Sequence, residues 1–151
     1  AAKMVLQAHE TVDAGRIGAI GFCFGGGVAL TMAREGEDLS GVVAFHSGLP
    51  TEPPAVKGRA KAPMLVINGA DDGFIKPESI AAFMKEMVEA NTDLTYISMQ
   101  GVRHSFTNPQ ADEFQKKFNL PDLAYNKQAD ERSWAAMREF FKRVFADKPG
   151  K

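Results

Sequence analysis

Short apolar runs alternate with amphipathic segments along most of the chain. Four apolar runs of strand length occupy residues 16–22, 40–46, 62–69 and 93–99. Apolar residues at helical spacing occur in residues 1–13, 25–36, 76–91 and 128–147. Apolar positions three and four residues apart form one face of a helix, whereas short continuous runs form buried strands. The pattern therefore predicts four strands that alternate with helices.

This order of elements is typical of βαβ units, which form parallel sheets. The run "MLVI" at residues 64–67 is apolar at every position, as expected of a strand that is buried on both faces. We therefore predict an α/β fold with a mostly parallel sheet and helices on both faces. The chain shows no repeat, low-complexity tract or interdomain linker, so we expect residues 1–151 to belong to a single domain.

The composition excludes several classes of partner. The 151 residues are 44% hydrophobic and 25% charged, with a formal net charge of −1, which suits one domain with a substantial core. A near-neutral chain has no electrostatic footprint for nucleic acid. Its apolar runs are shorter than the about 20 residues that cross a bilayer. We expect neither a nucleic-acid nor a membrane partner; the compartment stays open, with the cytoplasm favoured, because a signal could precede Ala1.

Three chemically active residues lie just beyond predicted strands, within five residues of each strand's end. Cys23 follows the first run, Asp72 the third and His104 the fourth. The carboxyl ends of parallel strands meet at one edge of a sheet, so these side chains should converge. Cys23 is the only cysteine and lies between Gly21 and Gly25, in a strand–turn–helix context typical of a nucleophile elbow. In so tight a turn we expect glycines where side chains would clash.

The three residue types fit nucleophilic catalysis. Cys23 would lie at a helix N-terminus, where backbone N–H groups and the helix dipole favour a thiolate. The backbone N–H of Phe24 would donate to an oxyanion. His104 would move protons, and Asp72 would orient it, although Asp71 is an alternative. The chain order of nucleophile, acid and histidine is that of α/β-hydrolases.

Aromatic residues and histidines surround these motifs. We expect core packing for most of them and a pocket role for some, the candidates being Phe22, His46, Phe74 and Phe106. A hydrogen-bonded structural role for His46 is an equal alternative, and His9 is expected on the surface of the first helix. The histidines lack metal-ligand spacing, and the glycines match neither a phosphate loop nor a dinucleotide motif. We therefore predict no metal and no cofactor.

Three motifs together carry a resemblance. "GFCFGGG" around Cys23, "GADDGFI" around Asp72 and "GVRHSF" around His104 resemble the dienelactone hydrolase family of α/β-hydrolases. The likeness extends from about residue 16 to residue 145. It implies a Cys-His-Asp triad, and the family's acid turn selects Asp72 over Asp71. It also implies hydrolysis of a carboxylic ester or lactone through an acyl-enzyme.

Two departures from the family modify these expectations. The family member that opens dienelactones has an arginine four positions after the histidine, where this chain has Asn108, while Arg103 precedes the histidine. We therefore expect a broader small-molecule ester or lactone preference. The family also has strands and a second oxyanion donor before the elbow. We expect this chain to be the C-terminal part of such a domain, without its N-terminal third, and to self-associate through an exposed sheet edge.

Two other functions remain open from the sequence. One is a hydrolase-like fragment without catalytic activity that serves as a binding or structural module. The other is a glutamine amidotransferase, which also uses a cysteine elbow. The carboxylate of that class usually follows the histidine as H-x-E, whereas "HSF" stands here, and this disfavours it.

Overall fold

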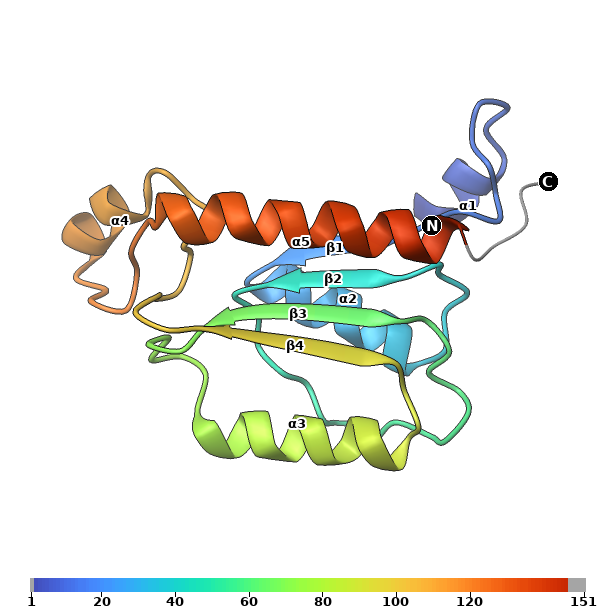
Figure 1. The fold of residues 1–151 in the computed structure, drawn as a ribbon, viewed down its shortest axis with the longest axis horizontal. Coiled ribbons are helices and arrows are strands. Elements are labelled where there is room, and N and C mark those ends of the chain that lie inside the picture. Colours follow the sequence, from blue (N-terminus) through green and yellow to red (C-terminus); the bar gives the residue numbers. More distant parts are fainter. Residues whose placement is uncertain (1, 147–151) are drawn as a thin grey trace.

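The computed structural model describes residues 2–146, whose strands form one parallel sheet (Figure 1). The strand order in the sheet is the order in the chain, and each strand pairs in parallel with the next. The strands are β1 (Ala19–Phe22), β2 (Val42–Phe45), β3 (Met64–Gly69) and β4 (Leu94–Met99). All four carboxyl ends therefore lie at one edge, as the predicted α/β fold requires.

Helices cover both faces of this sheet, which confirms that prediction. Along the described chain they are α1 (Ala2–Gln7), α2 (Phe24–Arg34), α3 (Pro77–Glu89), α4 (Ala111–Phe118) and α5 (Lys127–Ala146). The helices α2 and α3 lie on one face and α5 crosses the other (Figure 1).

Alternating side chains of the strands build two cores. In β2, Val42 and Ala44 pack in the cluster that includes residues of α2 and α3, while Val43 and Phe45 pack in the cluster that includes Phe140 of α5. All four β2 residues are fully buried. The middle strands are thus covered on both faces, which accounts for their continuous apolar sequence.

The N-terminal segment differs from its prediction. The helix expected over residues 1–13 ends at Gln7, and residue 1 lies outside the described residues. Its apolar side chains Met4, Val5 and Leu6 are exposed, so no core contact extends the helix. His9 lies beyond the helix in a turn, where its Nδ1 is 2.9 Å from the hydroxyl of Thr11. The prediction that His9 lies in a helix is therefore wrong, although it is on the surface.

Other boundaries shift by a few residues, and one helix was not predicted. The run at residues 16–22 contributes only Ala19–Phe22 to the sheet, because pairing with β2 begins at Ala19. The last helix starts one residue earlier than expected, and residue 147 lies outside the described residues. The helix α4 was not predicted because it has only 8 residues, too few for a helical period to be read reliably, although its apolar residues Ala111, Phe114 and Phe118 do lie at helical spacing.

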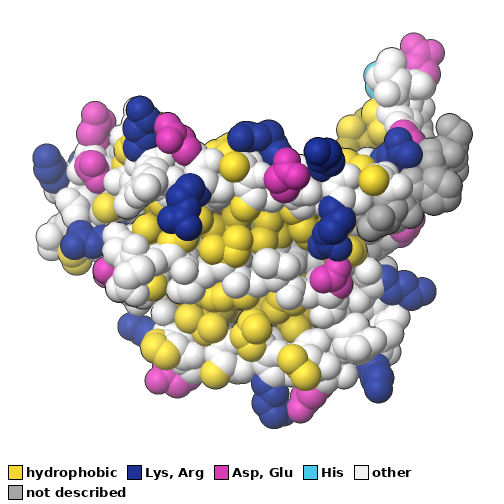
Figure 2. Space-filling model, viewed as in Figure 1, with side chains coloured by type: hydrophobic (Ala, Val, Ile, Leu, Met, Phe, Trp, Pro, Cys, Tyr) yellow, Lys and Arg dark blue, Asp and Glu magenta, His cyan; other side chains and the backbone are white. Residues whose placement is uncertain are grey.

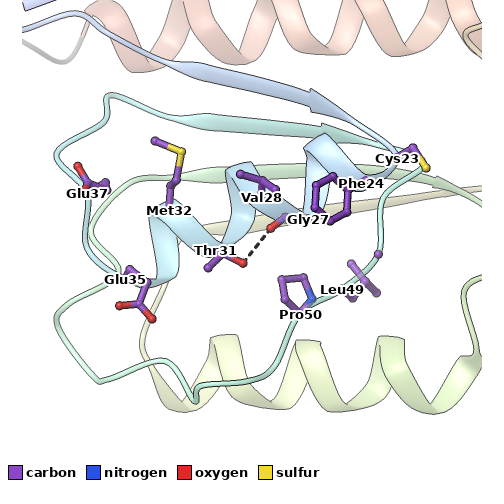
Figure 3. Close-up of a pocket in the computed structure, with 11 residues that line it drawn as sticks. Cys23, Phe24, Gly27, Val28, Thr31, Met32, Glu35, Glu37, Leu49 and Pro50 are labelled. Carbon is purple, nitrogen blue, oxygen red and sulfur yellow. Dashed lines mark hydrogen bonds between the residues drawn. The ribbon is translucent and has the colours of Figure 1, made fainter. Parts of the chain in front are cut away.

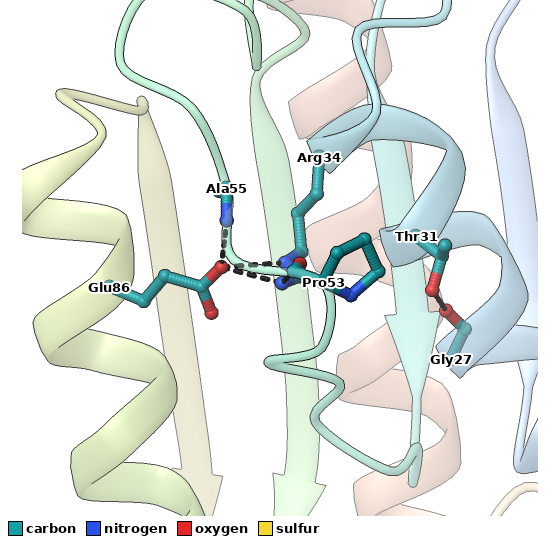
Figure 4. Close-up of polar contacts among 6 residues, drawn as sticks. All are labelled: Gly27, Thr31, Arg34, Pro53, Ala55 and Glu86. Atoms are coloured by element: carbon teal, nitrogen blue, oxygen red, sulfur yellow. Dashed lines mark hydrogen bonds and ion pairs between the residues drawn. The ribbon is translucent and has the colours of Figure 1, made fainter.

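A buried ion pair connects α2, α3 and the loop between β2 and β3 (Figure 4). Arg34 is 2% exposed and donates from Nε to Glu86 Oε1 at 3.2 Å and from Nη2 to Pro53 O at 2.6 Å. The same Glu86 oxygen accepts the backbone N–H of Ala55. One carboxylate therefore fixes both the guanidinium and the loop.

We expect Arg34→Met to lower the free energy of unfolding by about 3 kcal/mol or more, because it leaves the Glu86 charge buried without a partner. The double variant Arg34→Met/Glu86→Gln should recover part of this loss, because the introduced amide is neutral and its oxygen can still accept from Ala55. Urea unfolding of the three proteins measures both differences. A double variant that is no more stable than Arg34→Met would contradict this account.

The sheet of the described residues has two open edges. β1 pairs on one side with β2, and its Ile20 side chain is 47% exposed. At the other edge, Figure 2 shows apolar side chains between α3 and α5, around β4. The space between β4 and α5 is lined there by Leu65, Ile97 and Phe140. Open edges present unpaired backbone groups to other chains.

We expect the protein to self-associate through β1, because that strand combines an open edge with an exposed apolar side chain. The molar mass from light scattering should then rise with protein concentration. Ile20→Lys should abolish this rise by placing a charge in the middle of the strand. Thr95→Lys on β4 is the matched control and should leave the rise unchanged. A constant monomer mass at every concentration would refute the expectation.

Candidate active site

A tight turn between β1 and α2 holds Cys23 at the carboxyl edge of the sheet. Cys23 has φ 52° and ψ −121°, a backbone conformation that non-glycine residues seldom adopt. Its N–H donates to Phe45 O at 3.0 Å, and its C=O accepts from the N–H groups of Gly26 and Gly27. The Cys23 side chain is exposed. The strained turn thus presents the chain's one thiol at the surface.

Two close approaches make glycine necessary around this turn. A Cβ on Gly21 would lie 2.1 Å from Gly25 O, and one on Gly26 would lie 2.4 Å from Ser47 Cβ. A Cβ on Gly25 would have no neighbour within 4 Å. The prediction that glycine is sterically required is therefore confirmed at Gly21 and wrong at Gly25. The second residue that must lack a side chain is Gly26.

His104 and Asp72 meet in the interior beside this turn. His104 Nδ1 is 2.8 Å from Asp72 Oδ2, and Asp72 Oδ1 accepts the backbone N–H of Phe74 at 3.0 Å. Both side chains are buried, whereas Asp71 is exposed. The backbone N–H of Asp71 donates to Val102 O at 3.0 Å. Of the two neighbouring carboxylates, the structure brings only Asp72 to the imidazole.

The backbone of His104 is held by a segment that follows α4. Its N–H donates to Asp122 O at 3.0 Å, and its C=O accepts the N–H of Ala124 at 3.1 Å. This isolated bridge pairs His104 with Leu123. The imidazole is therefore oriented by Asp72, and its Cα is fixed by strand-like pairing.

Cys23 and His104 line the same cavity, which has a volume of about 460 Å³. Its other lining residues are Phe24, Gly48, Phe74, Ile75, Ser105, Leu120 and Leu123. None of them is a lysine, arginine or carboxylate, so the wall around the thiol and the imidazole is largely apolar.

A second hollow, of about 720 Å³, runs along α2 and also begins at Cys23 (Figure 3). Val28, Met32 and Leu49 contribute apolar surface to it. Phe24, whose side chain is 84% exposed, lines both spaces. The apolar cavity and this hollow, whose lining also includes Glu35 and Glu37, therefore meet at the exposed thiol.

The structure separates the four predicted pocket residues. Phe74 lines the cavity with Cys23 and His104. The ring of Phe22 stacks on that of Phe45, with 4.7 Å between the ring centroids, and Phe106 is fully buried. Phe22 and Phe106 therefore both belong to the core beneath α5. His46 lies behind the cavity, with its ring centroid 5.0 Å from that of His104.

Burial is the main cause of an unusual pKa at His46. It lowers the pKa of His46 from 6.5 to about 4, with the neighbouring His104 as a second cause. The His46 Nε2 lies 2.9 Å from Thr107 Oγ1. His46 is therefore a neutral imidazole at pH 7.

Sequence reasoning missed the leucines at the cavity wall. Leu120 and Leu123 belong to an irregular segment after α4, which has no helical or strand periodicity. They reach the site because this segment folds back to pair with His104. No local signal in the sequence indicates such a long-range pairing.

Asn108 and Arg103, the two polar residues that bear on the expected substrate preference, form hydrogen bonds with other parts of the chain. The side chain of Asn108 accepts from the Gln110 N–H at 3.0 Å, next to the start of α4. Arg103 is exposed and donates to Pro121 O at 3.1 Å. Neither residue lines the cavity that contains Cys23 and His104.

Two structural features bear on metal and membrane binding. Within residues 2–146, no three or more His, Cys, Asp or Glu side chains gather as a metal would require. None of the helices in this part of the chain is both long and apolar enough to cross a membrane.

One family model matches nearly the whole chain. The model of the dienelactone hydrolase family matches residues 1–145. An uncharacterised Caenorhabditis elegans protein is 33% identical over 148 residues, which cover 97% of this chain and 91% of that protein.

Solved structures extend the comparison. A dienelactone hydrolase-like promiscuous phosphotriesterase from metagenomic libraries is 38% identical, with a TM-score of 0.87 over 95% of this chain and 59% of its own. An alpha/beta hydrolase from a Medee basin deep-sea metagenome library shares the fold, with a TM-score of 0.72 at 17% identity, over 61% of its chain. The chain thus spans about three-fifths of each of these solved structures.

The lowered pKa of His46 predicts a pH-dependent stability. An unfolded histidine binds a proton near pH 6.5, whereas folded His46 does so only near pH 4, so stability falls as the pH drops through this window. The loss at about pH 5 should be about 2 kcal/mol relative to about pH 7.5. His46→Gln should remove that contribution. Urea unfolding of both proteins at the two pH values measures it, and equal losses in both would contradict the assignment.

Proposed function

The chain belongs to the dienelactone hydrolase family, and we propose that it hydrolyses carboxylic esters or lactones with Cys23 as its nucleophile. One observation carries this proposal. Cys23 and His104 line a single cavity, and the His104 ring is bound at its other side to the buried carboxylate of Asp72. This arrangement supplies the three groups of a nucleophilic triad.

The first step forms an acyl-enzyme. As the Cys23 sulfur attacks the carbonyl carbon of the ester, His104 takes the thiol proton, a C–S bond forms and the C–O bond to the leaving group breaks. His104 gives the departing oxygen its proton. Water then attacks the thioester with His104 as general base, the C–S bond breaks, and the acid leaves while Cys23 regains its proton.

Asp72 and Phe24 support these steps. With Nδ1 directed at Asp72, the His104 Nε2 is the nitrogen left for proton transfer. Phe24 is the first residue of α2, and the first N–H groups of a helix have no partner within it. Its N–H is therefore our candidate donor to the oxyanion that develops on the carbonyl oxygen.

The cavity wall favours an uncharged substrate. Its side chains are mainly phenylalanine, isoleucine and leucine, and the lining has no cation to bind a substrate carboxylate. Asn108 and Arg103 do not line it. A neutral ester or lactone with apolar groups fits this wall better than an anionic dienelactone does.

Acylation of Cys23 by p-nitrophenyl acetate tests the function directly. We expect intact-mass spectra to show the gain of one acetyl group on the wild type and none on Cys23→Ala. Release of p-nitrophenol should disappear in Cys23→Ala as well. A wild type that neither acquires the group nor releases p-nitrophenol would refute the proposal and favour a binding or structural module.

The two adjacent aspartates provide a matched control. Asp72→Asn removes the carboxylate that orients His104, so turnover should fall by about 100-fold or more. Asp71→Asn changes an exposed side chain and should keep wild-type turnover. Equal losses in both variants would exclude Asp72 as the orienting acid.

A further inference from the structure

His46 is a buried histidine with an unusual backbone conformation. It follows β2 with φ 36°, in a region that non-glycine residues seldom adopt, and it is 3% exposed. Its backbone N–H donates to Ile67 O at 2.8 Å, which fixes it against the end of β3. A buried imidazole in a strained backbone costs stability unless its side-chain contacts offset the cost.

Three side-chain contacts of His46 reach one short segment, residues 104–107. The His46 ring lies edge-on to the His104 ring, with 5.0 Å between the ring centroids, and edge-on to the Phe106 ring, with 5.3 Å between the centroids. Its Nε2 is 2.9 Å from the hydroxyl of Thr107, which is 61 residues away in the chain. One side chain thus contacts the first, third and fourth residues of the turn that carries His104.

The same segment is fixed elsewhere by its backbone. His104 pairs with the chain around Leu123, and the C=O of Phe106 accepts the N–H of Asn126 at 3.1 Å. These bonds hold the main chain but leave the His104 ring free to turn about its side-chain bonds. The ring itself contacts Asp72 at Nδ1, and Phe74 and His46 by aromatic contacts.

We propose that His46 is a positioning residue for the proposed triad: through its ring and its bond to Thr107, it holds the His104 imidazole toward Asp72 and the cavity. The proposal rests on the proposed function for its effect on turnover. Its effect on the His104 ring does not depend on that function.

The chemistry of His46 suits this position. The ionisable groups that act on it are His104 and Asp72, and burial with the nearby His104 keeps the pKa of His46 at about 4. A neutral ring can lie against His104 while His104 accepts a proton, whereas a second cation at this distance would oppose that protonation. The Thr107 hydroxyl can donate or accept, so it binds Nε2 in either neutral tautomer.

Thr107→Val tests the proposal with little change of shape, because it replaces the hydroxyl with a methyl group. NMR of the His104 Nδ1–H proton measures how firmly the ring is held against Asp72. We expect this proton to exchange with water about 10-fold faster in Thr107→Val, and kcat for p-nitrophenyl acetate to fall about 10-fold with KM within about 2-fold. Thr107→Ser keeps the hydroxyl and should restore both values.

A second variant removes the same hydrogen bond from the His46 side. His46→Phe keeps an aromatic ring but loses the bond to Thr107, so it should reproduce Thr107→Val. Unchanged proton exchange in both variants, with folded circular dichroism spectra, would overturn the proposal. If exchange accelerates as expected while the wild type is not acetylated by p-nitrophenyl acetate, the positioning role stands and the proposed function falls.

Discussion

Parallel pairing of four successive strands is the constraint on which the rest of the molecule depends. Because every strand runs in the same direction, the turns that follow β1, β2, β3 and β4 all open at one edge of the sheet. That single fact brings together residues from distant parts of the chain, with Cys23 after the first strand and His104 after the last. The two cores above and below the sheet keep this edge in register, since each middle strand contributes alternate side chains to both.

Much of the fold and the centre of the site follow from local sequence patterns. Continuous apolar runs such as Met64–Gly69 mark buried strands, and Pro77 marks the first turn of α3. The same patterns place Cys23, Asp72 and His104 in the turns after β1, β3 and β4, where the topology makes them converge. The structure adds the contact that distinguishes two adjacent aspartates, because only the side chain of Asp72 turns inward to His104.

The remaining parts depend on contacts that no local pattern encodes. Leu120 and Leu123 become cavity residues only because an irregular segment returns to pair with His104. Phe22 looks like a pocket residue from its place in the motif, yet its ring stacks in the core on Phe45. The pattern over residues 1–13 predicts a longer helix than the one that forms, since an apolar stripe extends a helix only where another surface covers it. Tertiary packing decides each of these outcomes.

The exposure of Cys23 has a consequence for redox chemistry. A thiol at the surface of a strained turn is open to peroxide, which converts it first to a sulfenic acid. In many proteins a second cysteine of the same chain then forms a disulfide and prevents further oxidation. This chain has one cysteine, so its sulfenic acid has no internal resolving thiol. A thiol from outside these 151 residues, such as glutathione, can reduce this sulfenic acid, whereas further oxidation to the sulfonic acid is irreversible.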